Sequence, residues 1–257
     1  MSEELRMNQE STMSKIAKVT IIFWIMKISA TTLGETAGDL LSMTLGFGYA
    51  MSAIIFLVIF LITLIGQLSV TKYIPVLYWS VILSTSIAGT AISDFMDRTL
   101  ALGYMKGSLI LVVILLAIFA YWYFSEKSLN INNIKTRKVE ILYWIAILFS
   151  NTLGTALGDF LADTSGLGYI GGAVLIGSLL AIIVLAFYFT KVSRVFLFWV
   201  AFVLTRPFGA TFGDLLTKPY EKGGFNLGTI GSSIVLAAIL VIFIVYDAMK
   251  NKKQPSH

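Results

Sequence analysis

The chain has no cysteine, and its single histidine, His257, is the last of 257 residues. Disulfides, thiolate metal sites and thiol catalysis are therefore excluded, and imidazole chemistry is nearly excluded as well. Charged residues are also scarce, at 13% of the chain, whereas a soluble domain carries about 25%. Functional polar chemistry must use carboxylates, hydroxyls, amides, backbone groups, lysine or arginine.

Hydrophobic residues make up 57% of the chain, which together with the low charge indicates an integral membrane protein. We do not expect the first residues to be a secretory signal, because Glu3, Glu4 and Glu10 are acidic and no small-residue cleavage site follows the long first apolar run. The net charge of +5 does not indicate a nucleic-acid partner, because its distribution follows the loops of a membrane protein.

A fourfold internal repeat organises the sequence. Four tryptophans are spaced by 55, 65 and 55 residues, and an aspartate follows each of them after fifteen residues. The ten extra residues fall in the polar stretch 125–137, so the chain divides into two halves of two repeats each. The pairs are Trp24 and Asp39, Trp79 and Asp94, Trp144 and Asp159, and Trp199 and Asp214.

Every repeat contains two apolar segments joined by a short glycine-containing connection. A bilayer core of ~30 Å needs about 20 apolar residues, and open strands would leave unsatisfied edges in lipid. We therefore expect an all-α integral membrane fold with eight transmembrane helices. They form four parallel two-helix repeats with pseudo-symmetry about the membrane normal. The segments are 17–41, 50–70, 74–96, 107–124, 139–161, 169–189, 195–216 and 227–246.

The basic residues predict the orientation of the chain. Thirteen lie in the tails and inter-repeat loops, but only Arg98, Lys106, Lys218 and Lys222 lie in the connections within repeats. The positive-inside rule then places both termini in the cytoplasm, and we expect the inner membrane of a cell. The expected divisions are a tail 1–16, a first half 17–124, a linker 125–138, a second half 139–246 and a tail 247–257. The thirteen are Arg6, Lys15, Lys18, Lys72, Lys127, Lys135, Arg137, Lys138, Lys191, Arg194, Lys250, Lys252 and Lys253.

Depth follows from helix rise, because fifteen residues at 1.5 Å each span about 22 Å. If the tryptophans lie at the cytoplasmic interface, the aspartates lie in the outer third of the membrane, as one ring or two facing pairs. Tyr49, Tyr104 and Tyr169 follow their aspartates by ten residues. We expect the tryptophans and these tyrosines to form two aromatic belts.

Two series of residues approach each aspartate at helical spacing. Small residues four apart favour close helix packing: Gly34 and Gly38, Gly89 and Ser93, Gly154 and Gly158, Gly209 and Gly213. Polar residues at i, i+4 and i+8 form a neighbouring stripe that should face the protein interior: Thr31, Glu35 and Asp39; Ser86, Thr90 and Asp94; Asn151, Thr155 and Asp159; Arg206, Ala210 and Asp214.

A single aspartate of this kind can simply cap a helix end. Serine, threonine or asparagine would cap equally well, however, and all four copies have aspartate. Ionisable groups inside membranes are costly and usually functional. We therefore expect Asp39, Asp94, Asp159, Asp214 and Glu35 to hold a cation, with a pathway or gate formed by Thr31, Thr90, Asn151, Thr155, Arg206 and Lys27.

The charged residues beyond this set have simpler interpretations. Lys27 can instead extend to the inner interface, and Arg206 can instead be a structural partner of a carboxylate. With only Lys27 and Arg206 as counter-charges, the five acids keep a net charge of −3. The charges one turn beyond the aspartates (Asp97, Arg98, Asp163 and Lys218) are expected to be solvated. The longer connection 217–224 is either a lid or a harmless insertion, and we favour the insertion.

The pattern of two small residues before each aspartate, with a tryptophan upstream and Gly-Tyr downstream, resembles a known family. The downstream pairs are Gly48-Tyr49, Gly103-Tyr104 and Gly168-Tyr169, and the fourth copy lacks one. The family consists of uncharacterised prokaryotic membrane proteins built from a repeat of unknown function, usually in four copies. The resemblance covers nearly the whole chain and implies a polytopic inner-membrane protein without a settled substrate.

The function that these residues favour is transport of a hard inorganic cation, with Mn²⁺ or Mg²⁺ favoured, by a secondary active and proton-coupled carrier. One alternative is a passive cation channel with an aspartate ring. The other is a non-transport scaffold or membrane enzyme. No second catalytic element accompanies the carboxylates, so we expect no enzyme and no cofactor. The expected partners are the lipid bilayer, the cation and protons, and the sequence leaves open whether the chain forms a homo-oligomer.

Overall fold

The computed structural model describes residues 15–134 and 136–252. Arg6, Lys135, Lys253, His257 and most of the two expected tails lie outside this part of the chain. The described residues form eight long helices and no strand. The helices are α2 (Ile21–Asp39), α3 (Tyr49–Ser69), α4 (Pro75–Asp94), α5 (Tyr104–Glu126), α6 (Arg137–Asp159), α7 (Gly168–Phe189), α8 (Arg194–Thr217) and α9 (Thr229–Lys252).

The first helix of each repeat begins at a recognisable signal. The side chains of Thr20, Thr136 and Ser193 accept hydrogen bonds from backbone N–H groups in the first turns of α2, α6 and α8, which satisfies donors that have no partner within the helix. Pro75 occupies the first turn of α4, where its missing N–H costs nothing.

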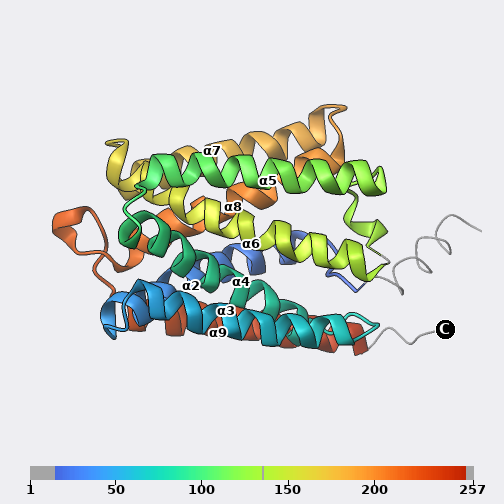
Figure 1. The fold of residues 1–257 in the computed structure, drawn as a ribbon, viewed down its shortest axis with the longest axis horizontal. Coiled ribbons are helices and arrows are strands. Elements are labelled where there is room, and N and C mark those ends of the chain that lie inside the picture. The colour runs from blue at the N-terminus through green and yellow to red at the C-terminus, as the bar shows by residue number, and fades with distance from the viewer. Residues whose placement is uncertain (1–14, 135, 253–257) are drawn as a thin grey trace, which may run out of the picture.

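The eight helices form two shells (Figure 1). The first helices of the repeats, α2, α4, α6 and α8, make an inner ring in which each helix packs against the next and α8 closes onto α2. The second helices, α3, α5, α7 and α9, lie outside it, with α5 and α7 on one side and α3 and α9 on the other. The repeats are thus arranged around one axis, as the equal spacing of the Trp and Asp residues predicts.

Each outer helix packs on the inner helix of the following repeat. Helix α3 lies along α4, α5 along α6 and α7 along α8, and α9 completes the circle by packing along α2. A repeat is therefore not a self-contained hairpin, and the two predicted halves share both shells.

The expectation of a polytopic all-α membrane protein is confirmed. Seven of the eight long helices in the described ranges have the length and apolar composition of membrane spans. Helix α2 falls short because Lys27, Glu35 and Asp39 lie along it, but it occupies an inner position equivalent to those of α4, α6 and α8. The outer helices α3, α7 and α9 bury only 17% of their apolar windows, as expected for surfaces that face lipid.

The end of the bundle at which the inner helices begin, here called the Trp end, is filled with aromatic side chains. Trp79, Trp144 and Trp199 are buried in the hydrophobic core, and Tyr78 and Tyr143 share a hydrogen bond of 2.7 Å between their hydroxyl oxygens. The expected tryptophan belt is therefore wrong for these three. These large aromatic side chains instead pack inward against one another between the four inner helices, where burial of their apolar surface stabilises the fold.

At the opposite end, the Asp end, three of the inner helices finish in a five-residue π-helical turn directly after the motif aspartate. The connection then passes through Gly48, Gly103 or Gly168, all with φ between 66° and 76°, a conformation that requires glycine. The following tyrosine begins or enters the outer helix, which explains the Gly-Tyr pairs. Of these tyrosines, Tyr169 is buried rather than placed in a belt.

Candidate functional site

The small stripe of each inner helix receives the polar stripe of the next helix. A Cβ added at Gly34 would lie 2.3 Å from Ser86 Oγ, and one at Gly209 would lie 2.5 Å from Thr31 Oγ1. Gly89 meets Asn151, and Gly154 meets Arg206, in the same way. Glycine is required because no side chain fits between helices that approach so closely. The same contact thus repeats four times around the ring.

This packing arranges the polar stripes in three layers along the axis. The Arg206 layer contains Thr31, Ser86, Asn151 and Arg206. The Glu35 layer, one turn closer to the Asp end, contains Glu35, Thr90, Thr155 and Ala210. The Asp layer contains Asp39, Asp94, Asp159 and Asp214. All twelve residues are buried.

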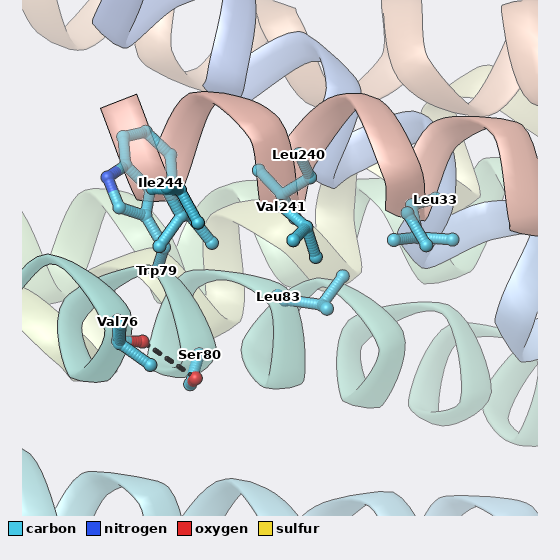
Figure 2. A pocket seen from close by; sticks show the side chains of 10 residues that line it. Leu33, Val76, Trp79, Ser80, Leu83, Leu240, Val241 and Ile244 are labelled. Carbon is cyan, nitrogen blue, oxygen red and sulfur yellow. Dashed lines mark hydrogen bonds between the residues drawn. The ribbon is translucent and has the colours of Figure 1, made fainter. Parts of the chain in front are cut away.

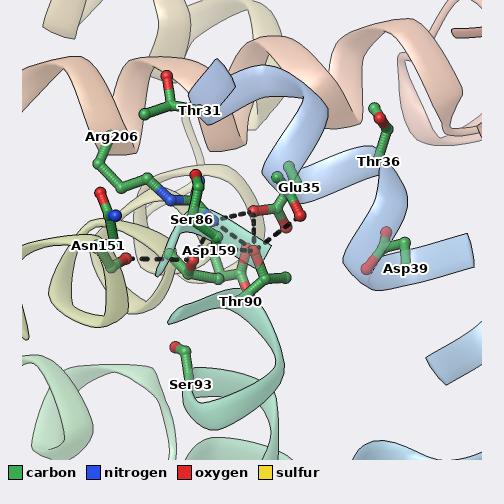
Figure 3. A network of polar contacts seen from close by, with 12 residues as sticks. Thr31, Glu35, Thr36, Asp39, Ser86, Thr90, Ser93, Asn151, Asp159 and Arg206 are labelled. Atoms are coloured by element: carbon green, nitrogen blue, oxygen red, sulfur yellow. Dashed lines mark hydrogen bonds and ion pairs between the residues drawn. The ribbon is translucent and has the colours of Figure 1, made fainter. Parts of the chain in front are cut away.

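The Arg206 side chain extends from its own layer, so that its guanidinium group lies among the residues of the Glu35 layer (Figure 3). Its Nη2 donates to Glu35 Oε2 at 2.9 Å, to Thr155 Oγ1 at 2.6 Å and to Thr90 Oγ1. The guanidinium is fully buried, and its Nε and Nη1 donate to no described residue. The structural pairing of Arg206 with a carboxylate is therefore present, and the pair joins the fourth repeat to the first.

Lys27 lies one turn beyond the Arg206 layer, toward the Trp end, and is also fully buried. The expectation that it extends to the membrane interface is therefore wrong. Its Nζ donates to Asn151 Oδ1 at 3.3 Å and lies 4.1 Å from the centre of the Phe202 ring. Asn151 donates in turn to Thr85 Oγ1 at 3.1 Å. The Thr31 hydroxyl lies within hydrogen-bond distance of the Lys27 and Ile28 carbonyls of its own helix, at 3.0 and 2.9 Å, and of the Thr205 carbonyl of α8, at 3.2 Å.

The four aspartates form two pairs, and each pair is bridged by a cation. Arg98 lies 2.8 Å from Asp94 Oδ1 and 3.6 Å from Asp159 Oδ2. Lys218 lies 3.0 Å from Asp214 Oδ1 and 2.7 Å from Asp39 Oδ2.

The two bridges are equivalent in the two halves of the chain. In both, the cation stands four residues after the aspartate of an even-numbered repeat and reaches the aspartate of the next repeat. The expectation that these two cations are solvated is therefore wrong. Their side chains are long enough to fold back by one helical turn and reach the Asp layer.

Of the other two expected rim charges, Asp163 is exposed, as predicted. Asp97 is buried and accepts a hydrogen bond from Ser93 at 3.3 Å. Its carboxylate also lies where a Cβ on Gly107 would stand. Asp97 therefore packs closely against the first turn of α5, is not the solvated charge that was expected, and stands outside the bridged pairs.

Lys218 stands just beyond α8, and its charge is secured by its neighbours. Burial lowers the pKa of its ammonium group, but Asp214 and Asp39 raise it by more, so this pKa lies well above its ordinary value. Lys218 is therefore protonated at neutral pH. Arg98, Lys218 and Arg206 are all paired with the five acids. If all five acids are ionised, these pairs leave two negative charges unbalanced, rather than the three expected from the sequence.

Three of the predicted metal ligands come together, and Lys218 bridges two of them, Asp39 and Asp214. Glu35, Asp39 and Asp214 each offer a carboxylate oxygen within 4.8 Å of the others, and all three are buried. Asp94 and Asp159 form the other pair, around Arg98. Sequence reasoning missed Arg98 and Lys218. Their signal was the same i+4 spacing, repeated 120 residues apart.

A separate cleft lies on the outside of the ring (Figure 2). Its volume is about 310 Å³, and it runs between α4 and α9. Apart from Ser80, whose hydroxyl donates to the Val76 carbonyl at 2.7 Å, its lining is apolar or aromatic, including Leu33, Trp79 and Leu240. It contains none of the motif carboxylates and therefore does not belong to the candidate site.

Comparison with known proteins agrees with the repeat. Searches of curated proteins and of solved structures found no match. A family model described as a repeat of unknown function, DUF347, matches residues 22–73, 77–128, 142–193 and 197–252. Each match contains one inner and one outer helix with its motif aspartate. The chain therefore belongs to the DUF347 family of proteins built from this repeat, in four copies.

Proposed function

We propose that the protein transports a hard inorganic cation, preferably Mn²⁺ or Mg²⁺, across the inner membrane as a secondary active, proton-coupled carrier. The observation that carries this proposal is the cluster of five buried carboxylates at one end of the inner ring, which share three cationic partners among the residues that the structure describes. If all are ionised, two negative charges remain for a substrate cation or protons to balance. Oxygen ligands of this kind suit hard cations.

The arrangement along the axis favours a carrier over a passive channel. Between the Asp layer and the Trp end, a cation would meet Arg206 and then Lys27, both fully buried. Buried positive charges repel a permeating cation strongly. The aromatic side chains of Tyr78, Tyr143 and Trp144 then close the Trp end. A carrier that changes conformation can move these groups, whereas a static pore with an aspartate ring cannot.

The distribution of lysine and arginine supports cytoplasmic termini. In that orientation the Asp layer faces the outside, behind Arg98 and Lys218, and the aromatic Trp end faces the cytoplasm. Protons that bind the carboxylates from outside would then be exchanged for the substrate cation when the Trp end opens.

The test is flux of Mn²⁺ into proteoliposomes with and without a proton gradient. Asp159→Asn removes one charge from the Asp layer, and we expect it to reduce flux at least about tenfold, as for loss of a functional intramembrane carboxylate. Asp163→Asn is the matched control, because Asp163 lies one turn further on and is exposed, and it should leave flux unchanged.

The form of the flux distinguishes the alternatives. Saturable flux that depends on the proton gradient supports the carrier, and flux that neither saturates nor depends on it supports a channel. Absence of flux for Mn²⁺, Mg²⁺, Ca²⁺ and Na⁺ would favour a scaffold or an enzyme. Unchanged flux in Asp159→Asn would remove this aspartate from the site.

A further inference from the structure

We propose that Lys218 is a built-in competitor of the transported cation. The cation binds between Glu35, Asp39 and Asp214 and displaces the Lys218 ammonium group from Asp39 and Asp214, whereas the Arg98 side of the layer stays closed. This inference rests on the proposed function and specifies which part of the carboxylate cluster binds substrate.

The geometry around Lys218 is that of an occupied cation site. Its Nζ lies 2.7 Å from Asp39 and 3.0 Å from Asp214. Asp214 Oδ1 is buried and, although the ammonium lies nearby, accepts no hydrogen bond. The three ligand oxygens lie within 4.8 Å of one another, which is within the distance of about 4.6–5.2 Å between opposite ligands of Ca²⁺. Binding of a smaller ion would draw the three oxygens closer together.

The charge of this side also matches a divalent cation. Glu35, Asp39 and Asp214 carry three negative charges when ionised, and Arg206 is paired with Glu35 at 2.9 Å. Lys218 balances only one of the two charges that remain. A divalent cation in its place balances both, which gives the substrate an electrostatic advantage over the lysine that it displaces.

The other side is held more firmly. The Arg98 guanidinium lies over the rings of Tyr49 and Tyr104, at 5.5 Å and 5.7 Å from their centres, and it belongs to the π-helical turn after α4. Arginine bridges two carboxylates with a rigid, permanently charged fork, whereas lysine is a point charge on a flexible stem. Lys218 stands in extended backbone at the end of α8, and its freedom to leave lies in its flexible side chain.

The repeat itself supplies a substitution that the fold tolerates. Four residues after the aspartate of the first repeat, the position equivalent to Lys218 is Met43. Lys218→Met therefore removes the ammonium group while keeping a side chain that this position already accepts elsewhere in the molecule.

The experiment measures Mn²⁺ binding to the full chain purified in detergent, by electron paramagnetic resonance of the free ion. We expect Lys218→Met to lower the dissociation constant for Mn²⁺ at least about tenfold, because it removes the competing charge. Lys222→Met is the matched control, since it removes an exposed lysine from the same connection, and it should bind as the unmodified chain does. Adding Asp39→Asn to Lys218→Met should abolish the gain.

The proposal is overturned if Lys218→Met binds Mn²⁺ no more tightly than Lys222→Met, or if Arg98→Met produces the same gain. If Lys218→Met does not yield folded protein by circular dichroism, Lys218→Gln carries the same expectation with a polar side chain. Because binding is measured without transport, tight binding without any flux would overturn the proposed function and still support the cation site.

Discussion

At the scale of single residues, packing explains why the fourth repeat differs from the others at positions 206 and 210. Arg206 extends one turn along the axis to reach Glu35, Thr90 and Thr155, and that turn on its own helix is occupied by Ala210. A larger side chain at position 210 would fill the space that the guanidinium needs. The arginine and the alanine of the fourth repeat are therefore one feature, and Glu35 in the first repeat supplies its counter-charge.

Breaking this buried pair from one side should be costly. We expect Arg206→Met to destabilise the protein by about 3–5 kcal/mol, because Glu35 would be left buried without its partner. The double variant Glu35→Gln with Arg206→Met removes both charges and should recover most of that loss. Thermal unfolding in detergent, followed by tryptophan fluorescence, checks both variants. Equal melting temperatures for the single and double variants would mean that the pair does not stabilise the fold.

The register of the carboxylates could be predicted from the sequence, because helical spacing places residues four apart on one face whatever surrounds them. The bridges of Arg98 and Lys218 could not. Each reaches one aspartate in its own helix and another in the next repeat. The second partner depends on which helices are neighbours, and spacing along the chain does not contain that information.

At the scale of elements, the connection from 218 to 228 is held against the end of α8. The backbone N–H groups of Phe225, Asn226 and Leu227 donate to the carbonyls of Leu215, Lys218 and Leu216, at 2.7, 2.9 and 2.9 Å. The residues directly after segment 217–224, which was expected to be a harmless insertion, thus fasten the backbone of Lys218. The fourth repeat also keeps a glycine with positive φ before its outer helix, Gly228, although it lacks the Gly-Tyr pair that the other copies show.

Gly224 provides a test of this element. A Cβ at this position would stand 2.0 Å from the Lys218 carbonyl oxygen, so Gly224→Ala must move the backbone that carries Lys218. We expect about 1–3 kcal/mol of destabilisation and a gain in Mn²⁺ affinity in the direction expected for Lys218→Met, measured in the same binding experiment. Gly231→Ala is the control, because no atom lies within 4 Å of its added Cβ. Unchanged Mn²⁺ binding in Gly224→Ala would show that the connection does not position Lys218.

At the scale of the whole molecule, the fold depends on interlocking of the repeats. The number and approximate limits of the helices could be predicted from the apolar segments, and the parallel order of the repeats from the constant Trp–Asp spacing. The packing partner of each outer helix could not. An outer helix that presents most of its surface to lipid has no strong amphipathic direction, so its sequence does not reveal whether it packs on its own repeat or on the following one.

The closure of the circle can be tested with cysteines, because the chain has none of its own. Ser233 of α9 donates a hydrogen bond of 2.8 Å to Thr36 of α2, and sulfur atoms in place of these hydroxyls lie within reach of a disulfide. After mild oxidation of membranes and denaturation in SDS, which exposes these two buried side chains, we expect Thr36→Cys with Ser233→Cys to resist labelling by a maleimide polymer, whereas both single variants are labelled. If α9 instead packed mainly on α8 of its own repeat, the two thiols would stay apart and react. Protection in the double variant therefore requires α9 of the fourth repeat to close onto α2 of the first, beside the separate α8–α2 contact that brings Lys218 and Asp214 to Asp39.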